Sequence, residues 1–389
     1  MNISPIKSGT LMPDFSQNSP LVRYALRGLE RCWLSEHGCW SHIYHLDGRA
    51  SPNESLRRSD VFYTLNVLLG MSRIKEVPSS INLSETFYRN AVQLTVLSVP
   101  KYALGMALWV SAELGLELPE QVRREVKALL IDQAGWKTFR AQDLGMLLTG
   151  VVAQAGAGGK EWVPFAAPLY RFLQERFYTG SGLFFDAASG FRRRFASFAT
   201  QIYLSIACYH YGEFAGESSA LAMADACVRK LIALQGPDGE WPWFFDAAGG
   251  RVLDFYEIYS VHQYGMAPAL LEWAERYRVE GARDALIKGF NWVLGKNQLR
   301  RSMLVTDLGL TIRSQLRKQE LSTRAPRVLR AIKNAYSGHE PGLIENAVVG
   351  LRLECRSYEL GWILWSFGQR GDLLELTHNS AFGKVPMPA

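Results

Sequence analysis

Hydrophobic positions along the chain alternate between two helical patterns, and the alternation repeats six times. One pattern is apolar almost throughout and contains glycine, whereas the other is amphipathic. The predicted apolar helices begin near Arg58, Lys101, Arg140, Phe195, Phe255 and Cys355. The predicted amphipathic helices cover residues 20–35, 84–98, 118–133, 162–177, 217–235 and 281–295. A repeated pair of helices predicts one inner and one outer helix in each unit.

The apolar helices share a short signature in which a glycine stands beside large apolar residues. Its copies are Leu104-Gly105-Met106, Leu144-Gly145-Met146, Tyr264-Gly265-Met266 and Leu360-Gly361-Trp362, with Leu68-Leu69-Gly70-Met71 as an offset variant. A fixed repeat of one helical hairpin outweighs local propensity when a fold is predicted. We therefore expect an all-α fold, an (α/α)6 toroid of six helical hairpins with small β-ribbons in the rim loops.

Length and composition fit one ring. The chain has 389 residues, of which 48% are hydrophobic, and a mean hydropathy of −0.06. Because all six hairpins are needed to close a ring, we expect a single domain over residues 18–372, a flexible N-terminal segment over 1–17 and a C-terminal tail over 373–389. No run of eighteen apolar residues predicts a membrane span. Residues 1–20 lack the hydrophobic stretch of a secretory signal.

The cysteines favour a reducing compartment. The chain has five of them, an odd number, mostly in apolar helical segments: Cys32, Cys39, Cys208, Cys227 and Cys355. This pattern predicts reduced core thiols in a cytoplasmic protein rather than disulfides.

The loops between the predicted helices differ in length in a regular way. Connections from an inner helix to the next outer helix are short, whereas four connections from outer to inner helix are long: 36–57, 178–194, 236–254 and 296–354. In an antiparallel ring the two sets emerge at opposite ends, so the long loops gather above the N-termini of the inner helices. Long loops in a compact domain often carry function, which predicts the binding site at this rim.

Three of the long loops resemble one another. Residues 182–190 and 243–250 both contain Phe-Phe-Asp-Ala-Ala followed by glycine, and residues 38–48 form a weaker copy. Aromatic residues before an Asp-Gly or Asp-x-x-Gly turn predict a small β-ribbon in each loop. The repetition favours a turn-forming role for Asp186 and Asp246 over a catalytic one.

The net charge of +6 is unevenly spread. Residues 296–335 carry ten lysines and arginines but only Asp307 and Glu320 as acidic residues. One interpretation is a solvated helical face; the other is a basic lip that attracts an anionic ligand, such as a uronate polymer or a diphosphate. Few aromatic residues interleave with these charges, which argues against a nucleic-acid surface.

The densest cluster of candidate catalytic residues spans Asp254–Tyr264, at the predicted start of the fifth inner helix. On a helix, Tyr256, Tyr259 and Gln263 share one face. Tyrosine, glutamate and histidine together supply the proton donors and acceptors of acid/base chemistry. The alternative is a hydrogen-bonded polar layer that closes the helix start. The catalytic candidates in this cluster are Tyr256, Glu257, Tyr259 and His262.

Two further inner helices begin with an arginine and a carboxylate three residues apart, Arg140 with Asp143 and Arg356 with Glu359. Asp60 lies in a looser version of this pattern. Residues three apart share a helix face and can pair. In a ring these carboxylates would point toward the axis. They either neutralise buried charge or surround a substrate, so Asp143 and Glu359 join the catalytic candidates. Asp60, Arg140 and Arg356 become candidates for substrate binding.

Aromatic and basic residues at the long-loop rim supply further binding candidates. Trp40, Trp241 and Trp243 have faces that stack on sugar rings or isoprenoid chains, although loop packing is an equally good use for them. Arg192 opens a run of three arginines that could hold an anion.

Several chemistries lack their sequence signals. No GxGxxG or Walker-type loop precedes a predicted helix, and no serine lies in a GxSxG elbow. His37, His42 and His45 do not have the spacing of a zinc site. We expect neither a metal nor a cofactor.

The stretch Leu231–Trp241 carries a family resemblance. It reads Leu-Ile-Ala-Leu-Gln-Gly-Pro-Asp-Gly-Glu-Trp and resembles the Leu-x-x-Gln…Asp-Gly-x-Trp element of α/α toroid proteins. In that superfamily the element ends an outer helix and stacks its Gln and Trp against the next hairpin. It occurs in terpenoid cyclases, and related stretches occur in polysaccharide lyases, six-hairpin glycosidases and glucuronyl C5-epimerase-like proteins. The Asp-x-Asp-Asp and Asp-Asp-x-x-Asp motifs of the cyclases are absent, so the sugar-active toroids are more similar.

This resemblance implies a carbohydrate-active enzyme that acts on an acidic or complex glycan by acid/base chemistry. A lyase or epimerase would use Tyr256 or Tyr259 with His262, and would neutralise a substrate carboxylate with Arg192 or Arg356. A glycoside hydrolase would instead need two carboxyl groups across a cleft. The candidates for that pair are Asp143, Glu257 and Glu359.

Two alternatives remain open. An isoprenoid-binding or cyclising toroid would have an apolar, aromatic-walled cavity. A non-catalytic scaffold that binds a glycan or a protein would have a flat or plugged ring. The preferred interpretation expects a glycan or another small-molecule or polymeric substrate as the partner, with an anionic substrate among the options, and no nucleic acid.

Overall fold

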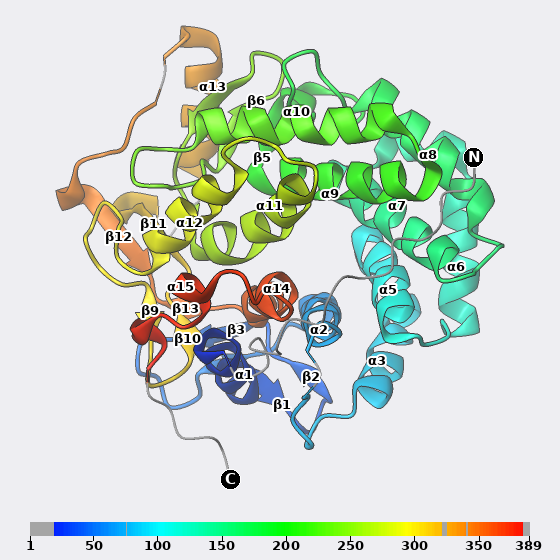
Figure 1. The fold of residues 1–389 in the computed structure, drawn as a ribbon, viewed down its shortest axis with the longest axis horizontal. Helices are drawn as coiled ribbons and strands as arrows, with labels where there is room; N and C mark the ends of the chain where they lie inside the picture. The colour runs from blue at the N-terminus through cyan, green and yellow to red at the C-terminus, as the bar shows by residue number, and fades with distance from the viewer. Residues whose placement is uncertain (1–18, 75, 321–324, 340, 384–389) are drawn as a thin grey trace.

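Six inner helices pack side by side into a closed ring (Figure 1). The computed structural model describes residues 19–74, 76–320, 325–339 and 341–383, so the expected N-terminal segment 1–17 lies outside the described residues. In chain order the inner helices are α2 (Arg57–Met71), α5 (Lys101–Leu114), α7 (Ala141–Gly156), α9 (Phe198–Ala215), α11 (Ala267–Arg276) and α14 (Ser357–Phe367). The last of them, α14, packs on the first, α2, and this contact closes the ring.

Six outer helices surround this ring. They are α1 (Pro20–Cys32), α3 (Leu83–Ala91), α6 (Glu120–Ile131), α8 (Val163–Arg176), α10 (Ser218–Leu234) and α12 (Ala282–Val293). Each has a buried face and a solvent face, whereas most residues of the inner helices are buried. The alternation of amphipathic and apolar helices, and the (α/α)6 toroid that it predicts, are confirmed.

Glycines set the close approach of the inner helices. A Cβ on Gly105 would lie 2.4 Å from the Met146 carbonyl carbon, and one on Gly145 would lie 2.9 Å from the Tyr203 carbonyl oxygen. A Cβ on Gly265 would meet the Cβ of Trp362 at 2.9 Å. The repeated glycine signature therefore marks the places where neighbouring helix backbones touch.

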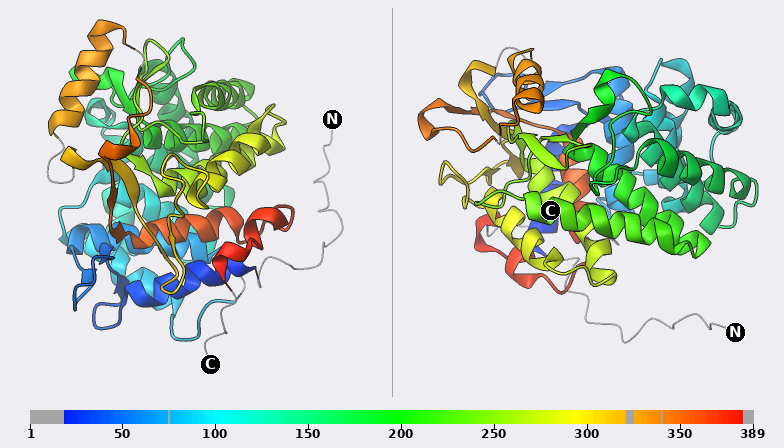
Figure 2. Two further views of the ribbon diagram at one scale, coloured as in Figure 1. Left: turned by 90° about the vertical axis from the view of Figure 1, so that its left-hand side faces the viewer. Right: turned by 90° about the horizontal axis from the view of Figure 1, so that it is seen from above.

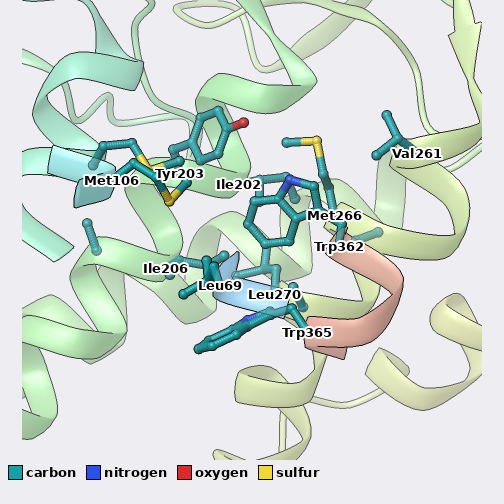
Figure 3. Packing of buried hydrophobic residues seen from close by; sticks show 14 of the residues in the cluster. Leu69, Met106, Ile202, Tyr203, Ile206, Val261, Met266, Leu270, Trp362 and Trp365 are labelled. Carbon is teal, nitrogen blue, oxygen red and sulfur yellow. The ribbon is translucent and has the colours of Figure 1, made fainter. Parts of the chain in front are cut away.

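Apolar side chains from the inner helices fill the interior of the ring (Figure 3). Leu69, Met106, Ile202 and Trp362 come from four different helices and point toward one another. Tyr203 lies on this cluster with its hydroxyl turned away from it. This cluster fills the middle of the ring with apolar side chains.

The start of the fifth inner helix differs from the sequence prediction. Residues 255–259 are not helical, and Ile258–Tyr259 pairs with the strand Ser314–Arg317. A π-helical turn at His262–Met266 then leads into α11. The long connection before α14 supplies this strand, and its hydrogen bonds replace those of the first helical turn. The expectation that Tyr256, Tyr259 and Gln263 share a helix face was therefore wrong.

Short strands join the long connections to one another. In chain order they are β1 (Trp33–Leu34), β2 (Cys39–Trp40), β3 (Ile43–His45), β4 (Asn53–Glu54), β5 (Phe195–Ser197), β6 (Phe244–Asp246), β7 (Arg251–Asp254), β8 (Ile258–Tyr259), β9 (Leu304–Val305), β10 (Leu310–Thr311), β11 (Ser314–Arg317), β12 (Val349–Arg352) and β13 (Glu354–Cys355). The sheets are β1-β2, β10-β9, β12-β11-β8, β13-β3-β4 and β5-β6-β7. Three of these sheets pair strands from different connections, which places the long connections together at one rim, as the loop lengths predicted.

The related loops behave unequally. In the β6–β7 turn Asp246 accepts a hydrogen bond from the Gly249 N–H, so its turn role is confirmed. The related stretch 182–190 forms only isolated bridges. Its Asp186 instead accepts hydrogen bonds from Thr200 and Arg192, so no ribbon forms there.

The Leu231–Trp241 element has the expected form. Helix α10 ends at Leu234, and the side-chain N–H of Gln235 donates to the Ala285 carbonyl of α12 at 3.0 Å. Trp241 stacks on Phe198, with ring centroids 5.5 Å apart. Gln235 and Trp241 thus tie this hairpin to its neighbours.

The remaining helical segments lie at the edges of the ring. Helix α13 (Ala325–Ser337) packs on β7 at the periphery of the molecule (Figure 2). Part of the segment that the sequence places in a C-terminal tail forms α15 (Leu374–Thr377) and a 3-10 turn (Ser380–Phe382), and Phe382 is buried against Tyr24 of α1. The other short segments are α4 (Gln93–Val96) and the 3-10 turns Gln133–Thr138, Phe191–Arg194, Lys318–Glu320 and Asn346–Val348. Among the described helices, none has the length and apolar character needed to cross a bilayer.

Candidate functional site

A cavity of about 440 Å³ opens over the N-termini of the inner helices. All six units of the ring contribute to its wall. The lining residues are Arg58, Ser59, Phe62, Tyr63, Ser98, Pro100, Tyr102, Gln142, Ala199, Tyr203, His262, Met266 and Tyr358. This is the rim at which the long connections meet, where the sequence predicted a site.

A simple rule places three of the lining residues. On α2, α7 and α14 the residue immediately before an acidic residue faces the cavity: Ser59, Gln142 and Tyr358. The acidic residues that follow them, Asp60, Asp143 and Glu359, are absent from the lining. Successive helix positions differ by about 100°, and in these three pairs the acidic side chain turns away from the cavity that the preceding residue lines.

Backbone capping explains where two of these carboxylates point. Asp143 accepts hydrogen bonds from the backbone N–H groups of Arg140 and Tyr102, both at 3.0 Å. Asp60 accepts from the backbone N–H of Leu56 at 3.1 Å and from the Ser55 hydroxyl. Helix N-termini leave unpaired N–H groups, and these carboxylates satisfy them. The expected orientation toward the ring axis was therefore wrong for both.

Glu359 is fully buried, and its partner is not the one its spacing predicted. Its Oε1 lies 2.5 Å from Nη1 of Arg313, which comes from the connection before α14. Burial raises the pKa of Glu359 to about 8, against the opposing effect of the Arg313 charge. Arg356 instead pairs with Glu354 at 2.8 Å and hydrogen-bonds His42.

Tyrosines dominate the wall of the cavity. The ring centroids of Tyr63 and Tyr358 are 4.6 Å apart. The ring of His42 stacks on Tyr63, with the centroids also 4.6 Å apart. Burial raises the pKa of Tyr102 to about 12 and also raises the pKa values of Tyr63 and Tyr358. These hydroxyls are therefore protonated at neutral pH and available as hydrogen-bond or proton donors.

His262 is the only one of the thirteen sequence candidates for the site that lines the cavity. Its ring lies 4.7 Å from Phe198 and 5.1 Å from Tyr259. Burial lowers its pKa to about 3, and the nearby Arg313 charge acts in the same direction. The imidazole is therefore neutral at pH 7 and can accept a proton.

Tyr259 connects the cavity to a buried ion-pair cluster around Glu257. Its hydroxyl donates to Oε2 of Glu257 at 3.1 Å. Arg327 and Arg352 each donate to the same carboxylate at 2.9 Å, and the Ser314 hydroxyl donates as well. Burial alone would raise the pKa of Glu257, but the bonds from Arg352 and Ser314 outweigh it and hold that pKa at about 2. Glu257 is therefore a permanent carboxylate.

Three arginines of the basic segment 296–335 turn inward and pair with carboxylates, whereas other basic residues of the segment, such as Lys296 and Arg300, are exposed. Arg313 binds Glu359, Arg317 binds Asp254 at 2.8 Å, and Arg327 binds Glu257. Arg317 and Arg327 are buried, and Arg313 is partly buried. They match carboxylates of the ring and its connections, so they form neither a solvated face nor a free basic lip.

The other candidates lie away from the cavity lining. Trp40 and Trp241 are buried, and Trp40 donates its indole N–H to the Leu29 carbonyl at 3.0 Å. Arg140 and Arg192 are exposed on the rim. The remaining two candidates have partners in the connections: Tyr256 hydrogen-bonds Gln298, and Trp243 lies under the Arg327 guanidinium at 4.2 Å.

Sequence reasoning missed the tyrosines of the cavity and its arginine. Arg58, Tyr63, Gln142 and Tyr358 all lie within the first two turns of inner helices. Gln142 stands directly before the capping residue Asp143, and Arg58 stands two residues before the capping residue Asp60, which was the available signal for these two. Among the described residues, no group of three or more His, Cys, Asp and Glu side chains could hold a metal ion.

Comparison with known proteins shows likeness in structure but not in sequence. No family model matches the chain, and no curated protein matches its sequence. Cellobiose 2-epimerase from Bacillus thermoamylovorans has a similar structure, with a TM-score of 0.61 and 10% identity over 89% of this chain and 97% of that one. Unsaturated glucuronyl hydrolase from Bacillus sp. GL1 gives a TM-score of 0.54 and 12% identity, covering 92% and 95%.

A polysaccharide lyase also has a similar structure, with a TM-score of 0.52 and 10% identity over 91% of this chain and 97% of that one. Each match spans nearly the whole of both chains, and each identity is too low to carry more than the architecture. Together with the closed ring of six hairpins, these likenesses show that the chain is an α/α toroid.

Proposed function

We propose that this chain is a carbohydrate-active enzyme that moves a proton on a sugar unit of an acidic glycan, as a lyase or an epimerase. The observation that carries the proposal is the lining of the 440 Å³ cavity. It combines tyrosine hydroxyls, one imidazole and one guanidinium, and its described lining residues include no carboxylate. The similar structures named as an epimerase, a hydrolase and a polysaccharide lyase support a carbohydrate substrate.

Arg58 is the residue best placed to bind a substrate carboxylate. It is exposed at the start of α2, and no carboxylate of the described chain pairs with it. A guanidinium binds a carboxylate through two parallel hydrogen bonds. Neutralising the uronate carboxylate in this way makes the neighbouring C5 proton more acidic, because negative charge that develops on the carboxylate is stabilised.

His262 and Tyr358 supply the proton transfers. The neutral imidazole of His262 accepts the C5 proton. In a lyase, Tyr358 or a neighbouring tyrosine donates a proton to the departing glycosidic oxygen as the C4–C5 double bond forms. In an epimerase, the donor returns a proton to C5 from the opposite face.

Hydrolysis and isoprenoid chemistry receive less support. A glycoside hydrolase needs two carboxyl groups on either side of the bond, about 5–9.5 Å apart. The three carboxylates proposed from the sequence, Asp143, Glu257 and Glu359, cap a helix or lie in buried ion pairs instead. An isoprenoid site would need an apolar wall, whereas Arg58, Gln142 and His262 are polar.

Product analysis on a panel of acidic polysaccharides tests the proposal. A lyase yields unsaturated uronates that absorb ultraviolet light, an epimerase exchanges C5 hydrogen for solvent deuterium, and a hydrolase yields new reducing ends alone. We expect His262→Gln and Arg58→Gln each to lower turnover about 100-fold or more. The control Lys160→Gln alters an exposed residue between α7 and α8 and should leave turnover unchanged. Retained turnover in His262→Gln, or reducing ends with neither unsaturation nor exchange, would refute the proposal.

A further inference from the structure

A second cavity, of about 310 Å³, lies beside the first. It is bounded by the β1–β2 connection, the start of α2 and the end of α3 with the segment after it. Its lining residues are Glu36, His37, Cys39, Ser55, Arg57, Asp60, Val61, Arg89, Asn90, Gln93 and Leu97.

The two cavities share their dividing wall. Four pairs of consecutive residues are split between them, with one member lining each cavity: Arg57 and Arg58, Ser59 and Asp60, Val61 and Phe62, and Leu97 and Ser98. The wall is therefore the first turn of α2 together with residues 97–100. A helix with its side chains is about 10–12 Å across, so a short oligosaccharide that occupies the first cavity can reach the second over this wall.

Both cavities open at the same rim. The β1–β2 connection belongs to the long loop before α2, and α3 runs back toward this rim, so that its C-terminal residues Arg89 and Asn90 reach it. The side chain of Asn90 donates to the Gly38 carbonyl at 2.9 Å, which fixes the loop against α3. A bound chain would thus cross from one cavity to the other without leaving the mouth of the ring.

The chemistry of the two cavities differs. The first has a guanidinium and no carboxylate among its described lining residues, which suits an acidic sugar unit. The second has groups of both signs, the carboxyls of Glu36 and Asp60 with the guanidiniums of Arg57 and Arg89, as well as two amides. Sugar hydroxyls donate and accept hydrogen bonds at once, so a lining of mixed donors and acceptors suits a neutral sugar.

We propose that the second cavity is a subsite for a neutral sugar unit next to the acidic unit held in the first. This inference rests on the proposed function and narrows its substrate class. The substrate is then a heteropolymer in which acidic and neutral sugars are neighbours, rather than a polymer of uronates alone. Arg57 is the main new contact, because it is exposed and no described carboxylate pairs with it, whereas Arg89 is paired with Glu85 at 2.9 Å.

Binding measurements with three probes test the subsite by titration calorimetry. The probes are glucuronate, a hyaluronan tetrasaccharide in which acidic and neutral units alternate, and tetragalacturonate. Arg57→Gln and Arg58→Gln form a matched pair, since these consecutive residues face different cavities. We expect Arg57→Gln to weaken the binding of the hyaluronan tetrasaccharide about tenfold, as the loss of one charge-assisted hydrogen bond does. The affinity for glucuronate should not change. Arg58→Gln should weaken the binding of all three probes.

Glu36→Gln gives a second reading, because Glu36 is exposed and its change should not disturb folding. This variant should weaken the binding of the hyaluronan tetrasaccharide and leave the binding of tetragalacturonate unchanged. If the probes bind but Arg57→Gln affects none of them, or weakens glucuronate equally, the subsite is refuted while the proposed function stands. If Arg57→Gln weakens both tetrasaccharides alike, the preference for a neutral unit is refuted. If no probe binds the wild-type chain, the acidic-glycan proposal itself fails.

Discussion

Gly70 of α2 and Gly361 of α14 lie back to back where the first and last inner helices meet. A Cβ on Gly70 would lie 2.2 Å from the carbonyl oxygen of Gly361, and one on Gly361 would lie 2.8 Å from that of Asn66. Both distances are shorter than van der Waals contact. The ring is thus closed through backbone surfaces, at a point where a side chain has no room.

Replacement of Gly70 by alanine should therefore destabilise the ring. The added methyl group meets backbone atoms, which cannot rotate away, so we expect a loss of about 1–3 kcal/mol in the free energy of unfolding. Urea denaturation measures it. The matched control is Gly156→Ala at the end of α7, where a Cβ would meet nothing within 4 Å. This change should be neutral or stabilise by up to about 1 kcal/mol. Equal small effects at both positions would contradict the backbone contact.

Arg327 should hold α13 against the site. It is 4% exposed, donates to Glu257 at 2.9 Å and lies over Trp243. Breaking a buried ion pair typically costs about 3–5 kcal/mol. Glu257 keeps its bonds to Arg352 and Ser314 in the variant. We therefore expect Arg327→Met to lower the free energy of unfolding by an amount at or below the lower end of that range. Amide hydrogen exchange in α13 should accelerate more than exchange in α9.

The exposed Lys333 on the same helix supplies the control. Lys333→Met should leave exchange in α13 unchanged. If Arg327→Met also leaves it unchanged, the contact with Glu257 does not hold the helix in place.

Most of the architecture was predictable because it depends on local periodicity. The alternation of apolar and amphipathic helices, and the glycines at the inner contacts, are properties of short windows of sequence. The exception is the stretch from Phe255 to Tyr259, where β8 pairs with β11 more than fifty residues away. No local pattern reveals such a partner, so the sequence predicts the first turn of a helix where the structure has a strand.

The cavity lies at the rim that the loop lengths predict, but most of its lining residues differ from the candidates that the sequence suggests. Attention to the charged residues selected Asp60, Asp143 and Glu359, which turn away from the cavity toward backbone N–H groups or Arg313. The adjacent positions, such as Gln142 and Tyr358, line it instead. The preference of carboxylates for helix N-termini could have predicted the first two orientations, whereas the pairing of Glu359 with Arg313 depends on a distant connection.

His210 should make the protein less stable in acid. It is enclosed by Trp109 and Trp273, at ring distances of 5.5 and 4.8 Å, and burial lowers its pKa to about 3, with Arg73 and Arg276 adding to the effect. An unfolded histidine takes up its proton near pH 6.5. Between these values the unfolded chain binds more protons, so stability rises with pH and is lost as pH falls from 6.5 toward 3.

His210→Phe should remove this contribution. The slope of unfolding free energy against pH, measured by urea titrations between pH 6 and 4, should decrease by about 1.4 kcal/mol per pH unit. The exposed His339 serves as the control, and His339→Phe should leave the slope unchanged. An unaltered slope in His210→Phe would mean that the buried imidazole is already charged in the folded protein.

Tyr259 offers a sharper test of the candidate chemistry than Glu257. Glu257→Gln leaves Arg327 and Arg352 facing a neutral amide, so any loss of turnover would mix catalysis with a destabilisation of about 3–5 kcal/mol. Tyr259→Phe keeps the ring beside His262 and removes the hydroxyl bond to Glu257, at a cost of about 1 kcal/mol. If the hydroxyl takes part in proton transfer, kcat should fall about 100-fold or more while KM and the unfolding midpoint change little. A wild-type kcat in Tyr259→Phe would mean that His262 and the tyrosines of the cavity wall carry out the proton transfers without the Tyr259 hydroxyl. The Glu257 cluster would then have only the structural role of holding Arg327 and Arg352 in place.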